Sequence, residues 1–189
     1  MKTLFNALML FLILTLVTGV AYPLFITGVA QIAFHENANG SLIVKDKTIA
    51  GSELIGQQFD SVIYFTSRPS VLNYNPLPSG GSNYGLTNTK LKNLVDERKK
   101  NFIGFNHLDS NTVVPSEMLF ASGSGLDPHI SPEAALLEVD RISKARNFNN
   151  AQVQNLKKLI ENNTELPQYL LFGQKRINVL KLNMELDKL

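Results

Sequence analysis

The sequence contains no cysteine, and this absence excludes several kinds of chemistry. A chain without thiols has no disulfide framework, no thiolate nucleophile and no cysteine-ligated metal site. Any folded part of the protein must therefore be stabilised by an apolar core. The lack of cysteine is compatible with export from the cytoplasm but does not establish it.

The chain also lacks the basic stripe with interleaved aromatic residues that is typical of nucleic-acid-binding proteins. Its 18 lysines and arginines are nearly matched by 16 aspartates and glutamates. The densest basic run is Arg98-Lys99-Lys100, which follows Asp96-Glu97 directly. Such mixed charge is typical of a solvated helix face, so nucleic acid is not expected as a partner.

Charged side chains are absent from Thr3 to Phe34, where nearly every residue is apolar or glycine. A helix needs about 20 mostly apolar residues to cross the hydrocarbon core of a bilayer. The segment is long enough, and we expect Pro23 to kink the helix because proline removes one backbone hydrogen bond. The sequence therefore predicts a single-pass anchor over residues 1–35 and one globular domain over residues 36–189.

A cleaved signal peptide is the alternative, since Lys2 and the small residues Gly19-Val20-Ala21 fit that pattern. The apolar run continues to Ala33, however, well beyond the ~7–15 residues of a secretory core segment, which favours an uncleaved anchor. Lysines on both sides leave the orientation open by charge alone. The short amino-terminal tail favours a cytoplasmic amino terminus with the globular domain outside.

The remainder mixes expected strands and helices without a regular alternation, which predicts an α+β (mixed α/β) domain. The strands are expected at 41–44 and 48–50 as a hairpin, at 62–65, and at 177–182. Helices are expected from Asn88 to Gly104, from Ser131 to Ala145 with Leu136, Val139 and Ile142 inward, and after a cap at Asn150. Residues 67–88 are rich in Pro, Gly, Ser and Asn and predict a long ordered loop.

Two glycine-bearing segments are candidate anion or nucleotide sites, because successive backbone N–H groups beside glycines can surround an anion. Neither matches a Walker A loop, and a structural turn or docking surface is the alternative for each. The candidate residues are Ser79, Gly80, Gly81, Ser82, Ser122, Gly123, Ser124 and Gly125. No metal site and no catalytic set is predicted.

The second segment continues into Asp127-Pro128-His129 and a capped helix. Ser124, Asp127 and His129 could form a membrane-anchored hydrolase, but the spacing is not that of a nucleophile elbow. A tethered solute-binding domain is a further alternative. The first predicts substrate turnover, and the second predicts a ligand that raises the melting temperature.

Several motifs, in order, resemble the C subunit of the Kdp-type potassium-transporting P-type ATPase. They are Leu54-Ile-Gly-Gln-x-Phe59, Tyr64-Phe-x-x-Arg-Pro-Ser70, Tyr74-Asn75, Ser79-Gly-Gly-Ser-Asn83, Ser122-Gly-Ser-Gly-Leu-Asp-Pro-His-Ile-Ser-Pro132 with Ala134-Ala135, Arg141, Ala145-Arg146, and Arg176-x-Asn-Val-Leu-x-Leu-Asn183. With the apolar segment, the resemblance covers essentially the whole chain. Tyr84, Leu86, Glu117 and Gln174-Lys175 depart from the pattern.

The resemblance implies a non-catalytic accessory subunit of a high-affinity potassium uptake complex. Its partners would be a potassium-selecting, channel-like subunit, a P-type subunit that hydrolyses ATP, and membrane lipid; potassium is the transported ion. Candidate partner contacts are Arg68, Tyr74, Asn83, Asp127, His129, Arg176 and Asn178.

The family is also associated with raising the ATP affinity of the catalytic subunit, as a so-called catalytic chaperone. No cofactor is expected to bind tightly to this chain, and ATP would be met through the complex. A domain outside the membrane cannot touch ATP bound inside, so any such effect requires coupling through the membrane part or the reverse topology.

Overall fold

The computed structural model describes residues 1–45, 47–169 and 171–189. Contacts between Cα atoms divide the chain into two units, Met1–Ala50 and Gly51–Leu189. We describe each unit by itself. The domain boundary at residues 35 and 36 stays a prediction.

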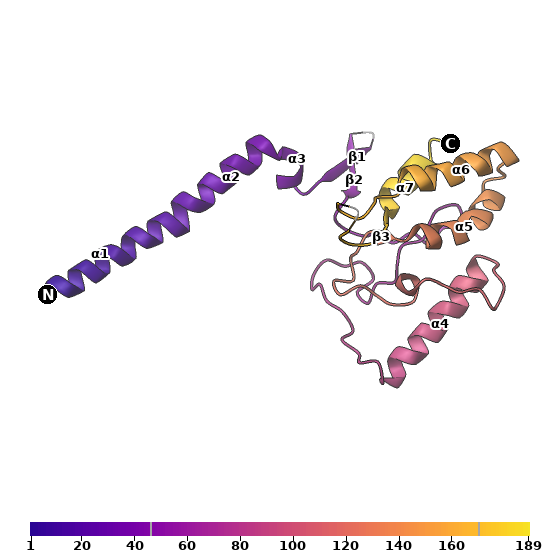
Figure 1. Ribbon diagram of the computed structural model, residues 1–189, viewed down its shortest axis with the longest axis horizontal. Helices are drawn as coiled ribbons and strands as arrows, with labels where there is room; N and C mark the ends of the chain where they lie inside the picture. Colours follow the sequence, from indigo (N-terminus) through magenta and orange to yellow (C-terminus); the bar gives the residue numbers. More distant parts are fainter. Residues whose placement is uncertain (46, 170) are drawn as a thin grey trace. The chain divides into compact units, whose positions relative to one another are not determined.

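The first unit is dominated by one apolar helix, which is long and apolar enough to cross a membrane (Figure 1). It consists of α1 (Lys2–Leu16), a π-helical stretch η1 (Val17–Ala21) and α2 (Tyr22–Ala33). The widened turn lies just before Pro23, which cannot donate to the preceding turn. The backbone hydrogen bonds adjust there by a π-helical stretch, and α1, η1 and α2 run on as one long helix in Figure 1. The kink expected at Pro23 stays a prediction.

After the long helix come the one-turn helix α3 (His35–Ala38) and the strands β1 (Leu42–Lys45) and β2 (Thr48–Ser52). The two strands form a two-stranded sheet, which confirms the predicted hairpin. The loop between them contains residue 46, which is outside the described residues.

The second unit confirms the α+β prediction but is mainly helical. Its elements are α4 (Thr89–Phe105), the 3-10 turn η2 (Ser116–Met118), β3 (His129–Ile130), α5 (Pro132–Ala145), α6 (Asn150–Asn162), β4 (Ile177–Asn178) and α7 (Val179–Leu186). The strands β3 and β4 are antiparallel, with His129 opposite Asn178 and Ile130 opposite Ile177. This small sheet joins two segments that are almost 50 residues apart in the sequence.

The apolar core of the second unit lies among α5, α6 and α7, which lie close together in Figure 1. Its fully buried side chains include Val139 and Ile142 from α5, Leu156 and Ile160 from α6, and Leu182 and Leu186 from α7. Leu136, predicted to face inward, is instead 48% exposed. The inward stripe of α5 runs through Ala134, Ala135 and Glu138, so Leu136 falls on the opposite side of the helix.

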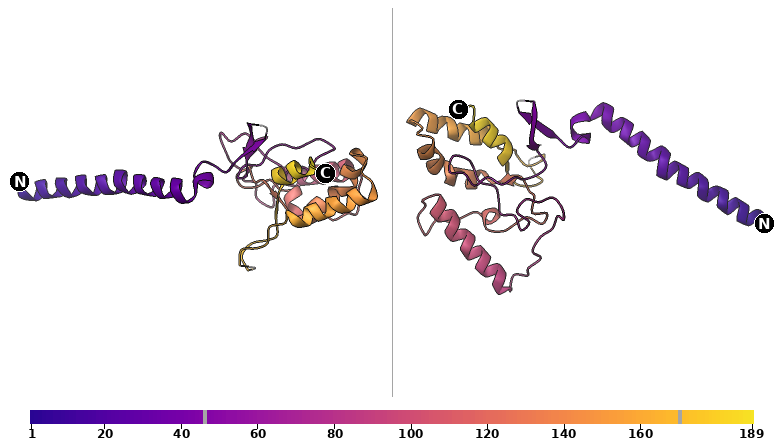
Figure 2. Two further views of the ribbon diagram at one scale, coloured as in Figure 1. Left: turned by 90° about the horizontal axis from the view of Figure 1, so that it is seen from above. Right: turned by 180° about the vertical axis from the view of Figure 1, so that it is seen from behind.

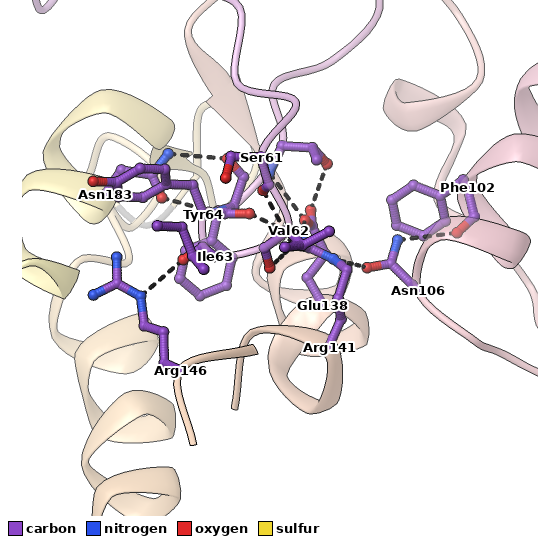
Figure 3. Close-up of polar contacts among 12 residues, drawn as sticks. Ser61, Val62, Ile63, Tyr64, Phe102, Asn106, Glu138, Arg141, Arg146 and Asn183 are labelled. Atoms are coloured by element: carbon purple, nitrogen blue, oxygen red, sulfur yellow. Dashed lines mark hydrogen bonds and ion pairs between the residues drawn. The ribbon is translucent and has the colours of Figure 1, made fainter. Parts of the chain in front are cut away.

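Residues 62–65 do not form the predicted strand, although their β-branched and aromatic residues favour one. Side chains of neighbouring helices take the hydrogen bonds that a partner strand would take (Figure 3). Asn183 of α7 binds both backbone groups of Phe65, accepting from its N–H at 2.8 Å and donating to its carbonyl at 2.9 Å. Arg146 donates to the Ile63 carbonyl at 2.9 Å. We call residues 61–66 the strap.

The predicted strand at 177–182 is also wrong beyond its first two residues. The side chain of Asn178 accepts a hydrogen bond from the Lys181 N–H and caps α7, so the chain turns into a helix after β4. Val179, Leu182 and Leu186 then recur at helical spacing and are all buried.

The helix starts at Ser131 and Asn88 are confirmed, since both side chains cap the following helix. The third helix begins one residue earlier than predicted, because Asn149 rather than Asn150 is its cap. Asn149 and Gln152 satisfy each other's backbone N–H groups in a capping box.

Candidate functional site: a charged cleft

A cleft of about 640 Å³ in the second unit collects the charged side chains that the sequence singled out. Four segments meet there: the chain just after the strap, η2 with the residue Phe120 that follows it, the β3 segment with the N-cap of α5, and the chain entering β4. Its lining comprises Arg68, Ser116, Glu117, Phe120, Asp127, His129, Ile130, Ser131, Gln174, Lys175 and Arg176. We call this site the charged cleft.

Arg68 and Asp127 form the central ion pair of the charged cleft, with Arg68 Nη1 2.5 Å from Asp127 Oδ2. The other carboxylate oxygen lies 3.0 Å from His129 Nδ1 and also accepts the His129 backbone N–H at 3.0 Å. One carboxylate thus orients both a guanidinium and an imidazole. All three side chains keep 19–30% of their surface exposed, so they remain available at the surface.

The ionised form of Asp127 is favoured by this arrangement. Burial alone would raise the pKa of its carboxyl group, but the hydrogen bonds from His129 and the positive charge of Arg68 outweigh burial and lower that pKa. The carboxylate is therefore charged at neutral pH, and the pair presents fixed charges of both signs.

Close backbone packing fixes the position of Asp127. The Gly56 N–H donates to the Leu126 carbonyl at 2.7 Å, and the Val179 N–H donates to the Pro128 carbonyl at 3.0 Å. A Cβ atom at Gly56 would lie 2.9 Å from the Asp127 carbonyl oxygen, closer than real Cβ contacts. Glycine at 56 therefore allows the two segments to approach each other.

The carbonyl of Arg68 accepts a hydrogen bond from the Tyr74 hydroxyl at 2.7 Å. Burial raises the pKa of that hydroxyl, against a hydrogen bond with Ser67 that lowers it. Tyr74 thus holds the backbone of Arg68 rather than lining the charged cleft.

Arg176 lies at the edge of the charged cleft and pairs with Glu165 at 2.9 Å, where both side chains are about half exposed. The structure thus brings together four of the seven predicted contact residues: Arg68, Asp127, His129 and Arg176.

The other predicted contacts are placed elsewhere. Asn178 is only 4% exposed, and its amide donates to the Glu53 carbonyl at 2.8 Å while its oxygen caps α7. These hydrogen bonds stabilise the fold, so Asn178 is not a surface contact residue. Asn83 has a φ of 53° and lies beside the glycine segments.

The two glycine segments pack against each other. A Cβ atom at Gly81 would lie 3.2 Å from the Gly123 carbonyl oxygen, and one at Gly125 would lie 3.2 Å from the Gly80 carbonyl oxygen. Gly125 adopts a positive φ of 70°, whereas Gly80 and Gly81 do not. Close approach of two backbones therefore explains Gly81 and Gly125, whereas a Cβ atom at Gly80 or Gly123 would meet open space.

A groove of about 470 Å³ runs beside the glycine segments. Its lining includes Gly81, Ser82, Ser122 and Gly123, but also Val71, Leu86, Leu91, Leu94 and Phe120. Arg98 is the one lysine or arginine among its described lining residues, and its Nη1 already donates to the Leu119 carbonyl at 2.9 Å. Burial lowers the pKa of Arg98, against a nearby glutamate that raises it. The groove suits apolar groups better than a chain of phosphates.

Only two of the three residues of the hydrolase alternative are hydrogen-bonded as a catalytic triad requires. Asp127 and His129 are hydrogen-bonded, as a triad requires. The Ser124 hydroxyl instead accepts the Leu126 N–H at 3.2 Å, and in the described part of the chain no hydrogen bond joins it to His129. The arrangement has an oriented imidazole without an engaged nucleophile.

Sequence reasoning missed a buried ion pair between Glu138 and Arg141 of α5 (Figure 3). Arg141 donates to the carbonyls of Val62 and Tyr64 and, at 2.8 Å, to the side chain of Asn106. Glu138 accepts two hydrogen bonds from Thr66 at 2.9 Å. Burial raises the pKa of Glu138, against Arg141 and Thr66, which lower it.

The signal for this pair was present in the sequence. Glu138 and Arg141 are three residues apart and interleave with Ala134, Ala135 and Ile142, so both lie on the apolar stripe of the helix. Charged residues at such positions are expected to be paired and to bind backbone groups.

Comparison with known proteins agrees with the motifs. Residues 4–188 match the family model described as "K+-transporting ATPase, c chain". A "Potassium-transporting ATPase KdpC subunit" of Leptospira interrogans is 47% identical over 94% of this chain and 90% of its own length.

Two further relatives of the same name match over nearly the whole length of both chains. The subunit of Dechloromonas aromatica is 46% identical over 99% of this chain and 98% of its own, and that of Mycobacterium tuberculosis is 42% identical over 100% and 99%. The match includes the apolar helix, which fits a membrane-anchored protein. The chain belongs to the family of the C chain of the K+-transporting ATPase and is an accessory subunit of that complex.

Proposed function

We propose that the second unit stabilises the assembly of the potassium pump by docking through the charged cleft. The observation that carries this proposal is the Arg68–Asp127–His129 arrangement, in which one carboxylate fixes two cationic or polar groups at a partly exposed surface. Charges held in this way need little ordering on binding, which favours a specific protein contact.

The proposed partners are the potassium-selecting, channel-like subunit and the P-type subunit that hydrolyses ATP. A single apolar helix does not line an ion pathway by itself, because a permeation route needs several elements around a cavity. Selection of potassium and hydrolysis of ATP are therefore assigned to the other subunits.

The proposed orientation has the amino terminus in the cytoplasm, the long helix retained as an anchor, and the second unit outside the cell membrane. The family match begins at residue 4, so the apolar helix is part of the shared chain, which supports an anchor over a removable leader. Intact-mass measurement of the purified protein distinguishes the two.

A higher ATP affinity of the catalytic subunit would, in this orientation, be transmitted through the membrane part. The groove beside the glycine segments offers a nucleotide little charge, as Arg98 is already bonded to a carbonyl. We therefore propose an indirect effect, without ATP bound to this chain.

The test is recovery of the complex after gentle extraction from membranes. We expect Asp127→Asn to reduce co-purification of the other subunits about tenfold, since a hydrogen bond to a charged group contributes about 1.5–3 kcal/mol. The matched control is Asp187→Asn, which removes a carboxylate that pairs with Arg146 at 3.0 Å and does not line the charged cleft. Equal recovery for both variants and the native protein would refute docking through the charged cleft.

A further inference from the structure

The segment between α6 and β4, described at residues 165–169 and 171–176, forms a narrow projection, which we call the finger. At its base Glu165 and Arg176 exchange backbone hydrogen bonds of 2.8 and 3.1 Å, and their side chains also pair. Nearer the tip, Gln168 and Phe172 exchange two further bonds of 2.9 Å. In the left view of Figure 2 the finger extends away from the helices of the second unit.

The finger carries four large apolar side chains that are mostly exposed within the described chain. Tyr169 is 86% exposed, Leu171 81%, Phe172 69% and Leu166 59%. Single exposed apolar residues are ordinary on protein surfaces, but several on one short projection mark an interaction site. Neither the accessory role nor the charged cleft accounts for these side chains.

The charge of the finger indicates what kind of surface it meets. From Leu166 to Arg176 the sequence has no acidic residue, while Lys175 and Arg176 stand at the carboxyl-terminal end. Aromatic and aliphatic side chains followed by lysine or arginine are typical of segments that lie in the membrane–water interface. Lys175 forms no ion pair within the described residues, so its charge can meet an anionic headgroup.

The anchor keeps a membrane within reach. About 17 residues separate the end of the long helix from Gly51, and a chain of that length spans at most about 60 Å. Such a tether holds the second unit at high effective concentration beside the bilayer, so a contact of few residues is enough.

We propose that the tip of the finger inserts into the headgroup region of the bilayer that holds the anchor. Tyr169, Leu171 and Phe172 enter the boundary between headgroups and acyl chains, and Lys175 remains at the headgroup level. The inference rests on the membrane anchor of the proposed function. The inserted residues Tyr169, Leu171 and Phe172 do not line the charged cleft, so the two proposals share only Lys175. The alternative is that the tip of the finger inserts into a pocket of another subunit.

The chain contains no tryptophan, so one introduced indole reports on one position without background. The test uses the full-length chain with Phe172→Trp, reconstituted into vesicles of phosphatidylcholine and phosphatidylglycerol with or without brominated acyl chains. We expect a blue-shifted emission and at least about twofold quenching by the brominated lipid. The control is Leu86→Trp, at a site 93% exposed and outside the finger, which should emit as in water and stay unquenched.

Equal emission and quenching for Phe172→Trp and Leu86→Trp would overturn the proposal. The proposal would also be overturned if the emission of Phe172→Trp shifted only in the presence of the other subunits and was not quenched by brominated lipid. The tip would then lie in a protein pocket and not in the bilayer. Complex recovery is measured separately on the Asp127→Asn variant, so failure of the finger proposal and failure of the docking proposal give different results.

Discussion

The side chain of Arg141 donates hydrogen bonds to two carbonyls of the strap. These bonds replace those that a neighbouring strand would make. The Arg141 guanidinium contacts the carbonyls of Val62 and Tyr64 and the Glu138 carboxylate, and it stacks 4.5 Å from the centre of the Phe105 ring. We expect Arg141→Met to lower the free energy of unfolding by about 3–5 kcal/mol, because Glu138 would be left buried without its partner. Denaturant unfolding of the full-length chain in detergent measures this.

Two further variants distinguish the effect of the lost ion pair on stability from the effect of lost packing. Adding Glu138→Gln to Arg141→Met should recover part of the loss, because the unpaired buried charge is then removed. Arg146→Met, at the C-cap of α5, should cost less, about 1–2 kcal/mol, because its charged partner Asp187 is partly exposed and can be hydrated. A double variant no more stable than Arg141→Met alone would show that the buried charge is not the cause.

The helix α7 depends on the cap at Asn178. That side chain also donates to the Glu53 carbonyl at 2.8 Å, so it joins the helix start to the first turn of the second unit. Asn178→Ala should destabilise the chain by about 1–3 kcal/mol, since both a cap and a buried bond are lost. Thermal unfolding followed by circular dichroism measures the loss.

The control for Asn178 is the exposed cap of α6. Asn149→Ala removes a capping box but no bond to another segment, so it should cost about 1 kcal/mol or less. If both variants had the same small effect, Asn178 would act only as a helix cap, and its tie to Glu53 would contribute nothing.

Helices with local start signals were predictable from the sequence, and elements defined by distant partners were not. Ser131, followed by Pro132 and Glu133, carries its own helix start, and the structure begins α5 there. The strap has the composition of a strand, but its hydrogen bonds go to Arg141, Arg146 and Asn183 from other elements. No local pattern reveals such partners.

The candidate site follows the same division. Asp127 and His129 are two residues apart, so their contact was foreseeable from the sequence, whereas Arg68 reaches them across 59 positions. Arg176 joins the charged cleft because β4 pairs with β3. The resemblance supplied these residues as a set, and the fold explains why four of them meet.

In the proposed function, the long helix tethers the protein to the membrane and the second unit docks onto the other subunits. Removing residues 1–35 should lower recovery of the complex by about a hundredfold, because docking would lose the effective concentration that the tether gives. Replacing the same residues with an unrelated membrane helix should restore most of the recovery. Gly19 and Gly28 leave open space beside the helix, so specific packing there is the alternative role of the anchor.

Co-purification of the tagged chain from membranes measures both variants against the native protein. Recovery with the unrelated helix near the native level means that the anchor acts through proximity, and the docking specificity then lies in the second unit. Recovery as low as that of the anchorless chain would contradict this, because the residues of the native helix would then be making contacts that a generic helix cannot supply. Gly19→Leu and Gly28→Leu in the native anchor would locate those contacts, since a bulky side chain keeps a neighbouring helix from approaching closely.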